Sequence, residues 1–213
     1  RPLAELRALA EASEMRCWDG DATSKMIAAV VAAQKAGDSL GGTVEVIAVG
    51  MPPGIGSHVE WDRRLDGRLA HALMSIQAIK CVEIGLGRES ARRLGSQVHD
   101  PIHYAHGRFT RPTNHAGGIE GGNTNGEPVI ARCSMKPIPT LARALASVDL
   151  QTKQPFSAQK ERTDACAVPA LAVIAEAAVA FVLASALLEK MGGDLMTEVL
   201  RNLQGYRDAL AAY

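Results

Sequence analysis

The stretch that decides the fold is Asn-His-Ala-Gly-Gly-Ile-Glu-Gly-Gly-Asn-Thr-Asn-Gly, residues 114–126. Its glycines are Gly117, Gly118, Gly121, Gly122 and Gly126. Glycine loses more conformational freedom on folding than other residues, so this density indicates positive φ angles or close backbone approach. Two interpretations follow. The glycines form tight turns between strands, or their bare N–H groups receive a phosphate or the polar edge of a flat cofactor.

A rigid basic segment follows the glycine-rich stretch. Lys136 comes ten residues after Gly126 and adds a point charge. Pro137 and Pro139 fix φ on either side of Ile138. The combination of glycine loop and stiffened lysine favours the ligand cradle over simple turns.

The composition excludes several functional classes. The chain has 213 residues, with 23 Lys and Arg against 23 Asp and Glu, so no charge surplus marks a nucleic-acid binder. Aromatic residues make up only 4%, which argues against base-stacking platforms. The cysteines at positions 17, 81, 133 and 166 have no paired spacing, and they indicate reduced thiols of a cytosolic protein.

Hydrophobic periodicity predicts an α+β protein made of one unit over residues 1–213. Expected helices cover Pro2–Ser13, Ala22–Ala36, Asp62–Lys80 with Asp62 as its cap, Pro169–Met191, and a last one from Asp194. Expected strands are Thr43–Val49, Cys81–Gly85, Glu127–Met135 and Ala146–Leu150. The strand before Gly50 is followed by prolines and not by G-x-G-x-x-G, so a dinucleotide-binding fold is rejected.

The apolar stretch from Ala165 to Leu188 predicts a helix buried on nearly every side and packed under a sheet. It is broken by Glu176 and has no flanking basic clusters, so we interpret it as a core helix and not a membrane span. Glu176 itself is expected to be a buried hydrogen-bonding carboxylate, because a buried charge needs partners.

Arg162 and Asp164 are the strongest candidates for chemistry in the second half of the chain, since they come just before this helix. Asp164 is either an N-terminal cap, stabilised there by the helix dipole, or a proton-handling carboxylate. In the second case Arg162 would grip an anionic ligand through its planar fork.

The remaining polar clusters give weaker signals. His99, His103 and His106 have zinc-like spacing, but they lie in a loop without nearby cysteines or visible partners for their other ring nitrogens, so no metal site is expected. Residues 88–93, Arg-Glu-Ser-Ala-Arg-Arg, are interpreted as a solvated loop or helix end.

Taken together, the chain resembles the chorismate synthase family, in its actinobacterial variety. The matching motifs are residues 54–66 (GIGSHVEWDRRLD), 74–80 (MSIQAIK), 82–85 (VEIG), 113–122 (TNHAGGIEGG), 124–126 (TNG), 135–140 (MKPIPT), 148–150 (VDL), 162–164 (RTD) and 166–170 (CAVPA). Their order and spacing agree along almost the whole chain.

The resemblance implies a lyase that converts 5-enolpyruvylshikimate 3-phosphate to chorismate by a 1,4-elimination of phosphate, with reduced FMN as cofactor and NADPH as a possible reductant. It implies a helical layer packed between antiparallel sheets, a homotetramer and a cytoplasmic enzyme of the shikimate pathway. No nucleic acid or membrane partner is expected.

The resemblance also assigns residues. Gln77, Ala78, Gly121, Lys136, Pro137, Ile138, Pro139, Thr140 and Arg162 would line the FMN site. Asp164 would be the carboxylate that manages a flavin proton. Departures from the family pattern are Thr163 for serine, Asn123 for a residue that is often methionine, Cys81 for glycine and Arg88 for an aromatic residue.

The resemblance covers only the C-terminal part of the family's chain. The opening Gly-Glu-Ser-His-Gly and the Arg-x-Ser-Ala-Arg segment are absent, and Gly87–Arg92 imitates the second motif in spelling only. The sequence opens at Arg1 in helical pattern without methionine, so we expect a partial or processed product. The alternative is a truncated, noncatalytic flavin- or anion-binding paralogue.

Overall fold

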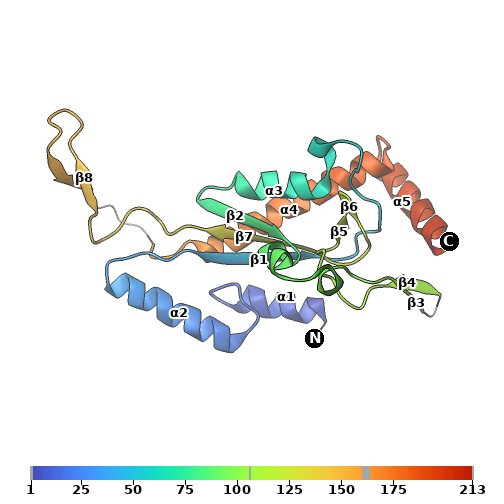
Figure 1. Ribbon diagram of the computed structural model, residues 1–213, viewed down its shortest axis with the longest axis horizontal. Helices are drawn as coiled ribbons and strands as arrows, with labels where there is room; N and C mark the ends of the chain where they lie inside the picture. Colours follow the sequence, from blue (N-terminus) through green and yellow to red (C-terminus); the bar gives the residue numbers. More distant parts are fainter. Residues whose placement is uncertain (1, 106, 160–163, 213) are drawn as a thin grey trace. The chain divides into compact units, whose positions relative to one another are not determined.

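The computed structural model describes residues 2–105, 107–159 and 164–212 (Figure 1). The chain divides into two compact units, which are described separately. The first comprises residues 1–44 and 134–173, and the second comprises residues 45–133 and 174–213. Folding of the whole chain as one unit stays a prediction.

The first unit contains the two N-terminal helices, α1 (Leu3–Ala12) and α2 (Gly20–Lys35). Both confirm the helices expected from the sequence. Asp19 caps α2 by accepting a hydrogen bond from the Ala22 amide at 2.9 Å, which satisfies one of the free N–H groups at a helix start. Gly37, at φ +71°, ends the helix.

A hairpin of β8 (Ala146–Val148) and β9 (Pro155–Ser157) also belongs to the first unit. The sequence predicted a strand from Ala146 to Leu150, but β8 ends two residues earlier because Asp149 begins the turn. Its Oδ1 accepts hydrogen bonds from the amides of Gln151 and Thr152. These bonds, the one from the Thr152 amide first, hold the pKa of the Asp149 carboxyl below its usual value.

A three-stranded sheet has the order β1-β7-β2, with β1 at Gly42–Ala48, β7 at Val129–Met135 and β2 at Ile79–Ile84. β1 and β7 each continue from one unit into the other. Val129, Ala131 and Cys133 alternate as buried residues along β7, as expected for a strand with one face toward the core. These strands confirm the sequence prediction.

Helix α3 (Leu65–Met74) packs in the second unit through Leu65, Leu69 and Leu73, all fully buried at a spacing of four. The prediction of one helix from Asp62 to Lys80 was wrong at both ends. Asp62 lies in a 3-10 helix, η1 (Trp61–Arg63), and does not cap α3. The C-terminal end turns at Ser75–Ala78 and enters β2, so the apolar period that suggested helix there belongs to a turn and a strand.

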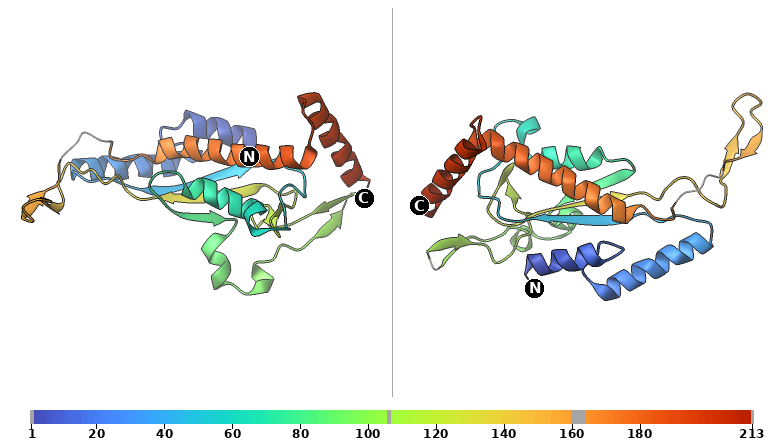
Figure 2. Two further views of the ribbon diagram at one scale, coloured as in Figure 1. Left: turned by 90° about the horizontal axis from the view of Figure 1, so that it is seen from above. Right: turned by 180° about the vertical axis from the view of Figure 1, so that it is seen from behind.

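Helix α4 (Val168–Met191) is followed by α5 (Met196–Ala211), as Figure 2 shows. The prediction that α4 is covered on nearly every side was wrong. Within the second unit its core face consists of Ala175, Val179, Val182, Leu183 and Ala186, all buried. The opposite face exposes Ile174 (50%), Phe181 (77%) and Leu188 (48%). Glu176 is likewise exposed and not buried as expected.

Helix α4 is long and apolar enough to cross a membrane by length and composition alone, and a third of its most apolar window is buried. Core helices of soluble proteins pass the same test. Its buried residues form one face only, so the interpretation as a core helix and not a membrane span stays a prediction.

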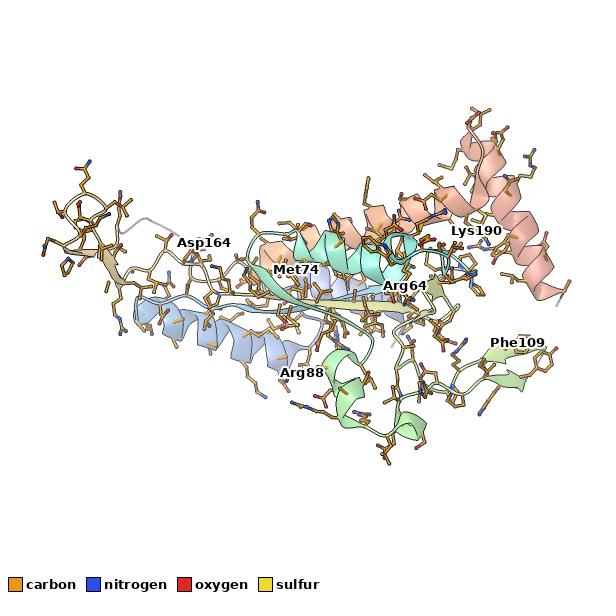
Figure 3. All side chains as sticks on the ribbon, turned by 45° about the horizontal axis from the view of Figure 1, so that its top comes forward. Arg64, Met74, Arg88, Phe109, Asp164 and Lys190 are labelled. Atoms are coloured by element: carbon orange, nitrogen blue, oxygen red, sulfur yellow. The ribbon has the colours of Figure 1, made fainter. Side chains whose placement is uncertain are left out.

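Several elements of only two or three residues escaped the sequence analysis, because so short a segment carries no readable period. They are β3 (His103–Ala105), β4 (Arg108–Thr110), β5 (Ile119–Glu120), β6 (Asn123–Thr124), β9, and the 3-10 helices η1 and η3 (Gly95–Gln97). The six-residue 3-10 helix η2 (Gly87–Arg92) lies where the sequence suggested a solvated loop or helix end. Tyr104 and Phe109 face each other across the β3–β4 hairpin, with ring centroids 5.0 Å apart; Figure 3 labels Phe109.

The exposed apolar face of α4 makes a prediction about self-association. Phe181→Ser should lower light scattering of the 213-residue chain, because it removes an exposed apolar side chain from a continuous stripe. The free energy of unfolding should change by no more than about 0.5 kcal/mol.

Leu183→Ala is the matched control on the buried face. This variant should lower the free energy of unfolding by about 2–5 kcal/mol without lowering the light scattering. An equal loss of stability in both variants would mean that Phe181 is buried in solution.

Candidate functional site

The first glycines of the 114–126 stretch are required by backbone packing. A Cβ atom on Gly117 would lie 2.3 Å from the Gly85 nitrogen, and one on Gly118 would lie 2.4 Å from the Pro128 carbonyl oxygen. Their amides donate to the carbonyl and the side-chain oxygen of Asn114. The expectation of bare N–H groups is therefore wrong for this pair, and the turn interpretation holds here.

Gly121 and Gly122 form the two-residue turn between β5 and β6 and have φ angles of +61° and +89°. Gly122 is enclosed, because an added Cβ would lie 2.5 Å from the Ser57 carbonyl oxygen. By contrast, a Cβ on Gly121 would meet no atom within 4 Å. Gly121, which the family resemblance assigns to the FMN site, is thus the member of this turn that leaves room for another molecule.

Thr124, a buried residue of β6, fixes this hairpin to the Pro52–Ser57 segment. Its hydroxyl donates to the Pro52 carbonyl at 2.6 Å and accepts from the Ile55 amide at 2.9 Å. Backbone bonds join Thr124 to Gly54 and Ile55 as well. The turn is therefore held by a fully paired polar residue in the core.

Gln77 and Ala78 lie in the turn between α3 and β2. Gln77 is exposed, and Ala78 has φ +67°. A left-handed alanine is uncommon and strained, and such residues cluster at functional sites. Arg16 and Lys153 have the same kind of positive φ, so the role of Ala78 as a site residue stays a prediction.

In the first unit, residues 39–41 lie against the lysine segment. The Ser39 hydroxyl donates to the Ile138 carbonyl at 2.6 Å. An added Cβ on Gly41 would lie 2.2 Å from the Met135 carbonyl oxygen. Lys136, Pro137 and Pro139 are exposed along this segment, whereas Ile138 and Thr140 are half-buried.

The same residues contact the chain just after Asp164. The Leu40 amide donates to the Ala165 carbonyl at 2.8 Å, and Leu40 forms a parallel bridge with Cys166. Asp164 is exposed, and Figure 3 labels it. Residues 39–41 thus bring Asp164 and the Lys136–Thr140 segment into one neighbourhood.

The predicted site residues therefore fall into two groups. Lys136–Thr140 and Asp164 belong to the first unit, and Gln77, Ala78 and Gly121 belong to the second. Arg162 lies outside the described residues. That the two groups form one site stays a prediction.

Asp100 is a buried carboxylate that the sequence analysis missed. Its Oδ1 accepts from the Thr113 hydroxyl at 2.6 Å and the His115 amide at 2.8 Å, and its Oδ2 accepts from the Ala116 amide at 2.9 Å. Burial alone would raise its pKa, but these three bonds and nearby His115 outweigh burial and hold the pKa below its usual value. Asp100 thus orders the chain that leads into the glycine stretch.

In the part of the chain that the structure describes, no three His, Cys, Asp or Glu side chains come together as a possible metal site. His103 is an exposed residue of β3, and His106 lies outside the described residues. Residues 88–92 lie within the 3-10 helix η2.

Comparison with known proteins shows to which family this chain belongs. The sequence profile of the chorismate synthase family matches residues 3–188. The chain is 57% identical to a chorismate synthase of Geobacter sulfurreducens over 99% of its length, and 60% identical to that of Syntrophotalea carbinolica over 93%. The chain belongs to the chorismate synthase family. The resemblance to the actinobacterial variety stays a prediction.

A solved structure titled "Crystal Structure of Chorismate Synthase" matches 99% of the chain with a TM-score of 0.83 and 44% identity. This match confirms the α+β fold class. The chain spans about half the length of these relatives, namely 56% and 51% of the two bacterial proteins and 55% of the crystallised chain.

The strain at Ala78 is testable. Ala78→Gly should raise the free energy of unfolding by about 0.5–1 kcal/mol. Left-handed geometry costs an L-residue about 1–2 kcal/mol, and glycine removes this cost. Glycine also gives the unfolded chain more conformational freedom, which offsets part of the gain in stability. Urea titration measures the change. The control Ala72→Gly, inside α3, should lower the same quantity by about 1 kcal/mol, and a loss at both positions would contradict the strain at Ala78.

Asp100 predicts a dependence of stability on pH. Because its folded pKa is lowered, its contribution is present above the unfolded value near 3.9 and is lost as pH falls through the folded pKa. Asp100→Asn should therefore lower the free energy of unfolding by about 1–3 kcal/mol at pH 7 and by less at pH 3.

Denaturant titrations between pH 3 and 7 measure this difference. Asp62→Asn, at an exposed carboxylate, is the control and should follow wild type throughout. A gap between Asp100→Asn and wild type that stays constant with pH would contradict the role of the charge.

Proposed function

We propose that this chain supplies part of the FMN site of a chorismate synthase. The whole protein would convert 5-enolpyruvylshikimate 3-phosphate to chorismate with loss of phosphate. The observation that carries the proposal is family membership at 51–60% identity over nearly the whole chain. The relatives named above are all called chorismate synthases, which favours an enzyme over a noncatalytic binding paralogue.

The residues present fit a flat, anionic cofactor. Gly121 leaves open space beside a turn in positive φ, and Ala78 holds a strained turn. Lys136 is exposed on a segment stiffened by Pro137 and Pro139, so its ammonium group is available to a phosphate. These residues, with Gln77, Ile138, Thr140 and Arg162, would hold reduced FMN.

When bound, reduced FMN would supply electron density that helps phosphate to leave. Asp164 would hold or accept a proton at its carboxylate, since it is exposed beside the segment that carries Lys136. Lys136 and Arg162 would balance the negative charge of cofactor and substrate. The whole protein would have to keep the reacting groups in register and exclude water.

The wider proposal covers cellular setting and assembly. We infer a cytoplasmic homotetramer that acts on small molecules of aromatic amino acid biosynthesis, without a nucleic-acid or membrane partner. NADPH is the proposed source of electrons for the flavin. Membership of the chorismate synthase family is the support for this setting, and the balanced overall charge gives no indication of a nucleic-acid partner.

The test of Asp164 uses the full-length protein. Asp164→Asn should lower kcat for phosphate release by about 100-fold or more, as expected when a proton-transfer group is lost. The FMN dissociation constant should stay within about threefold of wild type, because the amide preserves shape. Stopped-flow assays under anaerobic conditions and flavin fluorescence titration measure the two quantities.

Asp21→Asn, at an exposed acid of α2, is the control and should leave both quantities unchanged. Near-normal turnover in Asp164→Asn would refute the assigned role. Absence of elimination by the wild-type full-length protein would refute the enzyme itself.

A further inference from the structure

The turn at Gly121 is fastened unequally on its two sides. On one side, the carbonyl oxygen of Gly122 accepts hydrogen bonds from the amides of Ser57 and Leu65, at 3.2 and 3.0 Å. On the other side, Glu120 precedes the turn, and its side chain is 45% exposed. Antiparallel pairing with Asn123 holds the Glu120 backbone. Because a pair of glycines has wide conformational freedom, a side-chain contact on the Glu120 side restricts the geometry of Gly121 further.

Arg111 supplies that contact. Its Nη2 forms an ion pair with Glu120 Oε2 at 2.8 Å, and its Nη1 donates to the Asn125 carbonyl at 3.1 Å. Asn125 Nδ2 donates to the same Glu120 oxygen at 2.8 Å. One guanidinium thus joins the residue before the turn to the residue after β6.

The burial of Arg111 gives this contact its strength. Its side chain is only 14% exposed, so water screens the ion pair less than it screens a surface pair. The planar fork donates in two fixed directions, which a lysine cannot reproduce. Within the described residues Arg111 Nε has no hydrogen-bond partner, so the side chain is held by the two contacts through its terminal nitrogens.

We propose that Arg111 is a positioning residue for the cofactor. It acts through Glu120 and Asn125 and holds the Gly121 turn in the shape whose open side meets the flavin. It does not itself contact the reacting atoms. This inference rests on the proposed FMN function, and it adds a residue that neither the motifs nor the family resemblance assigned to the site.

The test uses the full-length protein and two readouts, the FMN dissociation constant and the hydrogen-exchange rate of the Gly121 and Gly122 amides. Arg111→Met should raise the dissociation constant about tenfold or more and speed exchange at both amides. Arg111→Lys keeps the positive charge but lacks the planar guanidinium, so it should have an intermediate effect on the dissociation constant and on the exchange rates. kcat at saturating FMN should stay within about threefold of wild type, because Arg111 does not take part in the chemistry.

Two further variants separate the mechanism from its alternatives. Glu120→Gln should weaken FMN binding in the same direction, and the double variant Arg111→Met with Glu120→Gln should be little worse than Arg111→Met alone, since both changes break one contact. Arg92→Met is the matched control. It breaks an exposed ion pair with Glu89 and should leave both readouts unchanged.

Three results would overturn the inference. They are wild-type FMN affinity in Arg111→Met, additive losses in the double variant (which would mean that Arg111 binds the ligand directly), and unchanged exchange at the turn. If Arg111→Met fails to fold by circular dichroism, Arg111→Lys and Glu120→Gln carry the test. If wild type itself binds no FMN, the proposed function fails, and the exchange rates still decide whether Arg111 fixes the turn.

Discussion

The structure of the second unit depends on backbone-to-backbone contact at the glycine stretch. Gly117 packs against Gly85, Gly118 against Pro128, and Gly122 against Ser57, each at a distance that no side chain could share. These contacts connect the chain after β2, the start of β7 and the approach to α3. A substitution at any of the three glycines would force backbone segments apart and not merely displace a side chain.

Polar side chains then hold what the glycines bring together. Asp100 binds the chain on the N-terminal side of the stretch, and Thr124 binds its C-terminal side to residues 52–55. Arg111 spans the hairpin between them. All three are largely or fully buried and hydrogen-bonded, so the loop owes its order to specific bonds in the interior more than to secondary structure.

The glycines of the 114–126 stretch differ in what surrounds them. Most of its glycines serve packing, and Gly121 remains open at the tip of a two-residue turn. In the proposed FMN site, a turn that is anchored on both sides would give the flat cofactor a rigid surface without side chains. In the first unit, residues 39–41 have the comparable role of holding the Lys136 segment beside Asp164.

The sequence by itself determined the family, the fold class, the long helices and the central strands. It could do so because their apolar periods extend over many residues and because the motifs are specific in order and spacing. It could not reveal the short strands β3 to β6 or the end of α3, since two or three residues carry no period and a turn such as Ser75–Ala78 is fixed by tertiary contacts. Only the tertiary structure decided that Asp100 and Arg111 are buried anchors, that Gly121 alone of its turn is open, and that α4 buries one apolar face and exposes the other. Burial and pairing depend on which distant segments meet, and local sequence does not contain that information.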